Sequence, residues 1–133
     1  MNTLIEVPIA TGELIDKITI LEIKLARISD PVKTANVRAE LALLSERRDS
    51  SLTPTALVEE LTARLKTVNE HLWELEDRIR ESDRQQDYGP SFVQLARGIF
   101  HSNDERAAIK REINLASGSR LMEEKSYACP ALP

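Results

Sequence analysis

The sequence predicts an all-α protein of antiparallel helical hairpins with one long helix, a short N-terminal extended arm and assembly into a helical oligomer. Apolar residues recur at heptad spacing in two long segments, and Pro or Gly stands at the segment boundaries. A chain of 133 residues with 41% hydrophobic and 30% charged residues is typical of one folded domain. We therefore expect a single helical domain over residues 1–133.

Residues 1–10 are expected to form the extended arm. Ile5, Val7 and Ile9 alternate with other residues, while Pro8 restricts the segment to a sheet edge or an arm. From Thr11 the apolar spacing changes to steps of four and three, at Leu14, Ile18, Leu21, Leu25 and Ile28. Thr11 or Gly12 is expected to cap this helix. Ile15, Ile20 and Ile23 lie off the seam, which predicts a helix covered on two sides.

Asp30-Pro31 is typical of a helix stop followed by a new start, because Asp caps helices and Pro fits the first helical position. A second helix is expected from Pro31 to about Arg48, forming an antiparallel hairpin with the first. Thr53-Pro54 again fits a cap followed by a proline at the first helical position, so a third helix should run from Pro54 to about Arg84. Its heptad positions are unbroken at Leu61, Leu65, Val68, Leu72, Leu75 and Ile79. At 1.5 Å per residue it would be about 45 Å long, which favours a partner helix from a second copy.

The segment Asp87–Pro90 predicts a loop and the start of the last helical region. Ser102 followed by Glu105 fits a capping box, so we expect a break near His101 and a fresh helix from Asn103 to Ala116, closed by Gly118. Residues 119–133 are expected to form an irregular tail.

Composition excludes several functional classes. A net charge of −4 and a pI near 5.3 argue against binding of duplex nucleic acid. No stretch has the roughly 18 apolar residues of a membrane span, and the N-terminus lacks a basic signal region, so we expect a cytoplasmic protein without membrane contact. The lone Cys129 is expected to be an inert thiol.

A polar stripe in the last helix is the candidate ligand site. Asn103, Arg106, Lys110 and Asn114 share one helical face, with Arg111 beside them and Arg97 farther upstream. Cations and carboxamides on a rigid helix suit a phosphate or nucleotide, with Phe92 or Phe100 as a stacking surface. The alternative is a solvated face whose charges pair locally.

Other polar residues predict no chemistry. The charges of Asp16, Lys17, Glu22 and Lys24 are expected to remain in water. His71 and Glu74 are one turn apart, but their order is the reverse of the usual metal motif, so no metal site is expected. Trp73 is interpreted as a packing residue. Without a Gly-rich phosphate loop, a nucleophile elbow or a Cys near a His, we expect neither an enzyme nor a bound cofactor.

The phrases GELIDKITILEIKLARISDP, VNEHLWELEDRIRE, FVQLARGIFHSNDERAAIKREINLASGS and EEKSY resemble a family of small uncharacterised bacterial and bacteriophage proteins. The resemblance covers most of the chain and implies a family pattern with many polar residues. These are Asp16, Lys17, Asn69, Trp73, Glu76, Asp77, Arg97, Asn103, Asp104, Arg106, Lys110, Arg111, Asn114, Glu124, Lys125 and Tyr127.

Two functional hypotheses follow. The first is a non-enzymatic homo-oligomer that binds an anionic, nucleotide-like small molecule through Arg97, Asn103, Arg106, Lys110, Arg111, Asn114, Lys125 and Tyr127. By analogy, such a protein could be a phage-type sponge that sequesters an immune signalling nucleotide. It predicts that Arg106→Ala and Lys110→Ala weaken binding without unfolding the protein. The second is a helical adaptor for a protein partner, for instance in a surface-glycan pathway.

Overall fold

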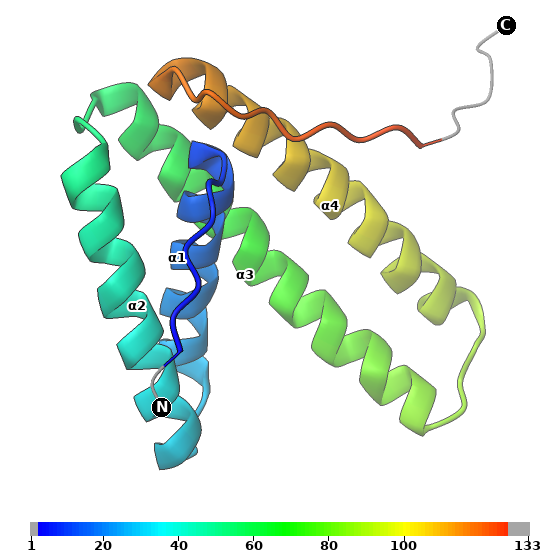
Figure 1. The fold of residues 1–133 in the computed structure, drawn as a ribbon. Coiled ribbons are helices and arrows are strands. Elements are labelled where there is room, and N and C mark those ends of the chain that lie inside the picture. Colours follow the sequence, from blue (N-terminus) through cyan, green and yellow to red (C-terminus); the bar gives the residue numbers. More distant parts are fainter. Residues whose placement is uncertain (1–2, 128–133) are drawn as a thin grey trace, which may run out of the picture.

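A computed structural model describes residues 3–127 and contains four helices (Figure 1). They are α1 (Thr11–Arg27), α2 (Pro31–Ser51), α3 (Ala56–Arg84) and α4 (Pro90–Ser117). No strand occurs in the described part of the chain, and residues 3–10 form an irregular arm before α1. The all-α class predicted from apolar periodicity is confirmed.

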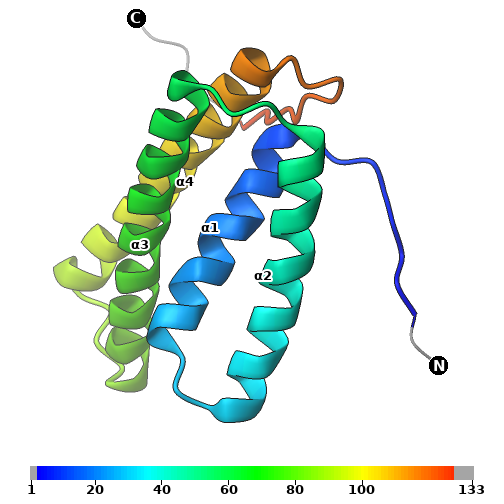
Figure 2. The same cartoon turned by 90° about the vertical axis from the view of Figure 1, so that its left-hand side faces the viewer.

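Helix α1 is the central element of the fold. It packs against α2 on one side and against both α3 and α4 on the other, whereas α2 contacts α1 alone among the helices (Figure 2). This placement explains why α1 is apolar around most of its circumference: Ile15, Ile18, Leu21 and Ile23 are all buried. The expected two-sided coverage of this helix is confirmed.

Helices α3 and α4 pair with each other along their lengths (Figure 1). The heptad residues Leu61, Leu65, Val68, Leu72 and Leu75 are buried. Part of this seam forms one core cluster with Ile109 and Ile113 of α4 and Ile15 of α1. The sequence predicts that the long helix α3 pairs with a helix of a second copy. In the structure its partner is α4 of the same chain, which is nearly as long, with 28 residues against 29. Homo-oligomerisation stays a prediction.

The predicted break near His101 is wrong, because α4 is continuous from Pro90 to Ser117. Ser102 does not cap a new helix but is itself buried inside α4. It lies seven residues after Leu95 and seven before Ile109, both buried, so it continues the stripe that faces the rest of the bundle. A straight helix keeps this stripe in line, and the capping-box spacing of Ser102 and Glu105 has no structural consequence.

Two predicted helix starts are also corrected. Helix α1 begins after Ala10 without a side-chain cap of its own, and neither Thr11 nor Gly12 serves as one. Instead, Asn114 and Ser119 supply acceptors from the other end of the chain. Helix α3 begins at Ala56, where the Thr55 hydroxyl accepts a hydrogen bond from the Val58 amide at 3.2 Å, so Thr53-Pro54 precedes the cap.

After α4, residues 119–127 form an irregular tail that returns along the same helix (Figure 1). The helix ends at Gly118, whose φ of 67° lies in the left-handed region that glycine favours. The rest of the expected tail, including Cys129, lies outside the described residues. Among the helices described, none has the length and apolar character required to cross a membrane.

Candidate functional site

A buried polar cluster joins the three helices that form the core. The Asp16 cluster consists of Asp16 and Thr19 from α1, Asn69 from α3 and Arg106 from α4. The Asn69 amide donates to Asp16 Oδ1 and to the Thr19 hydroxyl, both at 2.9 Å. Arg106 Nε donates to Asp16 Oδ1 at 3.0 Å, and Arg106 Nη2 pairs with the second carboxylate oxygen. The guanidinium and the carboxylate thus form a two-pronged ion pair.

Asp16 is fully buried, so the expectation that its charge remains in water is wrong. Helix α1 is flanked by neighbours on two sides, and position 16 faces one of them rather than solvent. A buried carboxylate is tolerated only when it is paired and hydrogen-bonded, which Arg106 and Asn69 accomplish here. Reciprocally, the hydrogen bond to Asp16 raises the pKa of Arg106 despite the opposing effect of its burial.

Next to the Asp16 cluster, α1, α3 and α4 enclose a groove of about 390 Å³, which we call the Trp73 groove. This volume lies within the range of about 300 to 1,000 Å³ that is common for small-molecule sites. Its lining combines an aromatic ring, carboxamides, carboxylates, guanidinium groups and aliphatic side chains. These are Ile20, Ile23, Asn69, Leu72, Trp73, Glu76, Asp77, Arg80, Asn103 and Arg106.

Several polar groups of the Trp73 groove have hydrogen-bonding capacity left. Arg106 uses Nε and Nη2 on Asp16, and its Nη1 makes no hydrogen bond to residues 3–127. The Asn103 carboxamide and the Asp77 carboxylate likewise make none within the described chain. Arg80 and Glu76 pair with each other at 3.4 Å on an exposed part of α3. The groove therefore presents donors and acceptors beside an indole ring.

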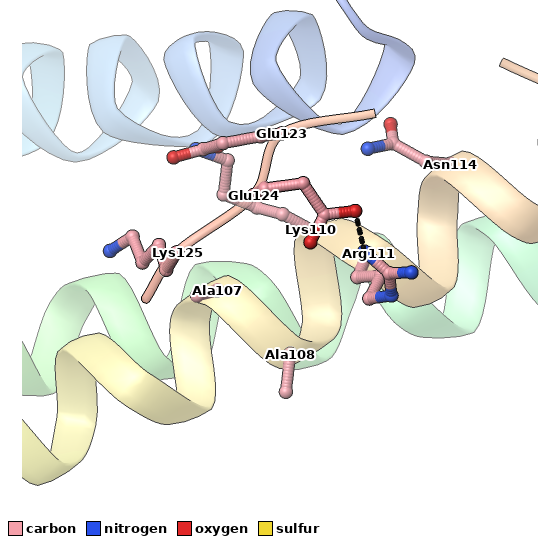
Figure 3. Close-up of a pocket in the computed structure, with 8 residues that line it drawn as sticks. All are labelled: Ala107, Ala108, Lys110, Arg111, Asn114, Glu123, Glu124 and Lys125. Atoms are coloured by element: carbon pink, nitrogen blue, oxygen red, sulfur yellow. Dashed lines mark hydrogen bonds and ion pairs between the residues drawn. The ribbon is translucent and has the colours of Figure 1, made fainter. Parts of the chain in front are cut away.

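A second hollow lies one turn farther along α4, under the returning tail (Figure 3). We call it the tail pocket. It measures about 220 Å³, and its lining includes the small residues Ala107 and Ala108. Lys110 Nζ bonds both Glu13 of α1 at 2.6 Å and Glu123 of the tail at 2.8 Å. Arg111 pairs with Glu124 at 2.9 Å.

These contacts perturb the titration of both partners. Burial lowers the pKa of Lys110, but the hydrogen bonds to Glu123 and Glu13 and the nearby carboxylates more than offset this, so the net shift is upward. The hydrogen bond from Lys110 lowers the pKa of Glu123 below its ordinary value of 4.5, against the opposing effect of its own burial. Both groups are therefore charged, and paired, at neutral pH.

The structure divides the candidate ligand residues into separate groups. Asn103 and Arg106 line the Trp73 groove. Lys110, Arg111, Asn114 and Lys125 line the tail pocket. Arg97 is exposed on α4 and lines neither hollow, while Tyr127 is exposed on the tail with Lys125 Nζ 5.9 Å from its ring centroid.

Asn114 has a structural role that the polar stripe did not reveal. Its side-chain oxygen accepts a hydrogen bond from the Gly12 amide at 2.6 Å, and the Ser119 hydroxyl accepts one from the Thr11 amide at 3.1 Å. These two acceptors satisfy amides at the start of α1 that would otherwise lack partners. The end of α4 thereby caps the beginning of α1.

Sequence reasoning interpreted Trp73 as a packing residue and did not place Asn69, Glu76 or Asp77 at a site. The signal that could have found them is spacing: positions 69, 73, 76 and 80 follow one another at three or four residues along α3, and position 77 lies four residues after 73. These mostly polar positions run along α3 next to its apolar heptad seam. They form a groove only together with Asn103 and Arg106 of α4, which the sequence alone does not place beside them.

Comparison with protein families matches residues 5–132 to a family of unknown function, DUF6165. The chain belongs to this family. No curated protein and no solved structure matches the sequence. The Trp73 groove and the tail pocket are therefore the features of this chain from which a ligand can be inferred. Within residues 3–127, no three His, Cys, Asp or Glu side chains gather in a way that could hold a metal ion.

Proposed function

We propose that this DUF6165 protein binds a phosphate-bearing, nucleotide-like small molecule without transforming it, and that the Trp73 groove is the binding site. The observation that carries the proposal is the chemistry of the groove lining. An indole, two carboxamides, two carboxylates and two guanidinium groups surround a hollow of about 390 Å³. These groups can contact the base, the ribose and the phosphate of a nucleotide.

Each group has a distinct role in this proposal. The Trp73 indole would stack on the base, a contact worth about 1 to 3 kcal/mol per base in nucleic-acid complexes. The Asn103 carboxamide can both donate and accept, which suits a base edge, whereas Asn69 uses its amide protons on Asp16 and Thr19 and offers only its oxygen. The Glu76 and Asp77 carboxylates can accept hydrogen bonds from ribose hydroxyls. Arg106 would offer Nη1 to a phosphate while its other nitrogens remain on Asp16.

The biological role that fits a binder without a catalytic set is sequestration. A protein that holds a nucleotide tightly lowers its free concentration, so we propose a phage-type sponge for an immune signalling nucleotide. In this proposal the protein acts in the cytoplasm as a homo-oligomer. Its net negative charge repels duplex nucleic acid, so the ligand is a small molecule.

Trp73 is the only tryptophan in the sequence, so its fluorescence reports on the groove alone. We expect saturable quenching or a spectral shift when the protein is titrated with a member of a panel of cyclic dinucleotides and cyclic ADP-ribose isomers. A ligand stacked on the indole changes its environment directly. Unchanged fluorescence across the whole panel, together with no heat of binding in calorimetry, contradicts the proposal.

A matched pair of variants localises the binding. Asn103→Ala should weaken the affinity about fivefold, since a lost hydrogen bond is worth about 1 kcal/mol. Asn36→Ala removes the same side chain from an exposed position on α2 and should leave the affinity unchanged. Equal effects of the two substitutions would place the ligand outside the Trp73 groove.

The second candidate function is a helical adaptor for a protein partner, such as a component of a surface-glycan pathway. One observation favours it: the arm exposes Leu4, Ile5 and Val7 beside a hollow of about 490 Å³ that it forms with α1 and α2. Recovery of one stoichiometric protein in a pull-down, lost when Ile5 and Val7 are replaced by Asp, would favour the adaptor over the binding protein.

A further inference from the structure

The tail pocket is an anion site whose occupant belongs to the chain itself. Glu123 and Glu124 are adjacent residues of an irregular segment, and their carboxylates are bonded to two adjacent cations of α4, Lys110 and Arg111. The contact distances of 2.8 and 2.9 Å are those of charge-assisted hydrogen bonds. The two carboxylates point to opposite sides of the tail (Figure 3), and each stands where an anionic group of a ligand would bind.

Besides these two ion pairs, this part of the tail is tied to α4 by a weak hydrogen bond from the Asn114 amide to Met122 Sδ at 3.6 Å. The Ser119 amide donates a hydrogen bond to the Asn114 carbonyl at 2.8 Å. Beyond Ser119, no backbone amide up to residue 127 donates to a backbone carbonyl. The Arg111–Glu124 pair is half-exposed on the Arg111 side and largely exposed on the Glu124 side, and such pairs contribute little stability. Lys110 also retains Glu13 as a partner, so loss of Glu123 does not leave its charge unpaired.

The space around the cations already has room for a larger group. Ala107 and Ala108 line the hollow beside Lys110 and Arg111, and Lys125 adds a third cation (Figure 3). Arg106, which borders the Trp73 groove, is one helical turn before Lys110 on α4. A ligand whose base occupies the groove can therefore extend its phosphates along α4 toward the tail pocket.

We propose that Lys110 and Arg111 form a phosphate subsite, which Glu123 and Glu124 occupy in the free protein and leave when the ligand binds. The ligand class is a small molecule with more than one phosphate group. This inference rests on the proposed function in one respect, that the ligand carries phosphate. Binding then releases the tail, so occupancy of the site is coupled to the exposure of residues 119–127.

Inorganic pyrophosphate tests the subsite in isolation, because it cannot stack on Trp73. Calorimetry at low ionic strength, where surface charges are least screened, compares the wild type with Glu123→Gln/Glu124→Gln. The double variant should bind pyrophosphate about tenfold more tightly, because the tail carboxylates no longer compete for the cations. Glu59→Gln/Glu60→Gln makes the same change in net charge at exposed positions of α3 and should bind like the wild type.

The amide NMR signals of residues 123–125 provide the second readout. Pyrophosphate should shift them in the wild type toward the positions seen in Glu123→Gln/Glu124→Gln, the reference for the released tail. Equal pyrophosphate affinity in the wild type and both double variants, or no binding by any of them, overturns the subsite. Nucleotides that quench Trp73 while the tail signals stay fixed also overturn it, and leave the groove proposal standing. Pyrophosphate binding with tail release, in the absence of any nucleotide effect on Trp73, supports the subsite and counts against the groove.

Discussion

Arg106 is the residue at which the ion pair with Asp16 and the proposed phosphate contact meet. Arg106 pairs with the buried carboxylate of Asp16, so Arg106→Ala leaves that charge without its partner. The substitution should destabilise the protein by about 3 kcal/mol. This is the lower end of the usual cost, because the guanidinium is itself partly exposed. Urea unfolding measures this change. Arg27→Ala breaks a mostly exposed pair with Glu74 and should cost less than about 1 kcal/mol. Similar values for the two variants would contradict the role assigned to Asp16.

This prediction differs from the expectation drawn from the sequence. The sequence alone predicts that Arg106→Ala weakens binding without unfolding the protein, because a polar helix stripe does not reveal which of its residues face a neighbouring helix. The charge of Asp16 within an apolar run was visible in the sequence, but its burial depends on α1 having helices on two sides. Pairing across 90 residues of chain leaves no local pattern.

At the scale of elements, the approach of α1 to α4 depends on Gly12. A Cβ atom at this position would lie 2.4 Å from the Lys110 carbonyl oxygen and 3.0 Å from Asn114 Oδ1. Gly12→Ala should therefore lower the free energy of unfolding by about 1 to 3 kcal/mol, as is usual for overpacking. The control is Gly98→Ala, whose Cβ would meet a flexible Leu75 side chain at 3.3 Å and should be close to neutral. Equal melting temperatures for wild type and Gly12→Ala would contradict this close contact.

The docking of the tail should depend on pH. The pKa of Glu123 is lower in the folded protein than its ordinary value of 4.5, so the pairing with Lys110 is fully present above pH 4.5 and is lost as the pH falls through the folded pKa. NMR signals of residues 123–125 should move toward those of Glu123→Gln/Glu124→Gln in this acidic range while the helices stay folded. Tail signals that change only with global unfolding would contradict the prediction.

The positions of the helices are the part of the fold that the sequence predicts best. The heptads of α1 and α3 and the proline at the start of α2 were sufficient to place these helices, because apolar spacing and proline geometry are local properties. The cap of α1 was inaccessible, since its acceptors come from Asn114 and Ser119, about 100 residues away. The capping-box spacing of Ser102 and Glu105 wrongly predicts a break at His101, because the buried stripe through Leu95, Ser102 and Ile109 keeps α4 continuous.

At the scale of the whole molecule, the exposed apolar arm, and not the long helix, is the feature that predicts an oligomer. Helix α3 is already paired with α4, whereas Leu4, Ile5 and Val7 remain exposed. Burial of such side chains between copies would be favourable by about 25 cal/mol per Å². We expect light scattering after gel filtration to give more than one chain per particle, and Ile5→Asp/Val7→Asp to give one. A wild-type monomer at all concentrations would contradict this prediction.

The central claim is that the Trp73 groove holds a phosphate-bearing small molecule. Mass spectrometry of the small molecules released from purified protein tests it without assuming the ligand. The protein would be made in cells that produce cyclic dinucleotides or cyclic ADP-ribose isomers, beside an Asn103→Ala variant with an unchanged circular dichroism spectrum. We predict that the wild type releases a phosphate-bearing molecule that the variant carries in smaller amount. Release of no such molecule, or equal release by both proteins, would contradict the claim.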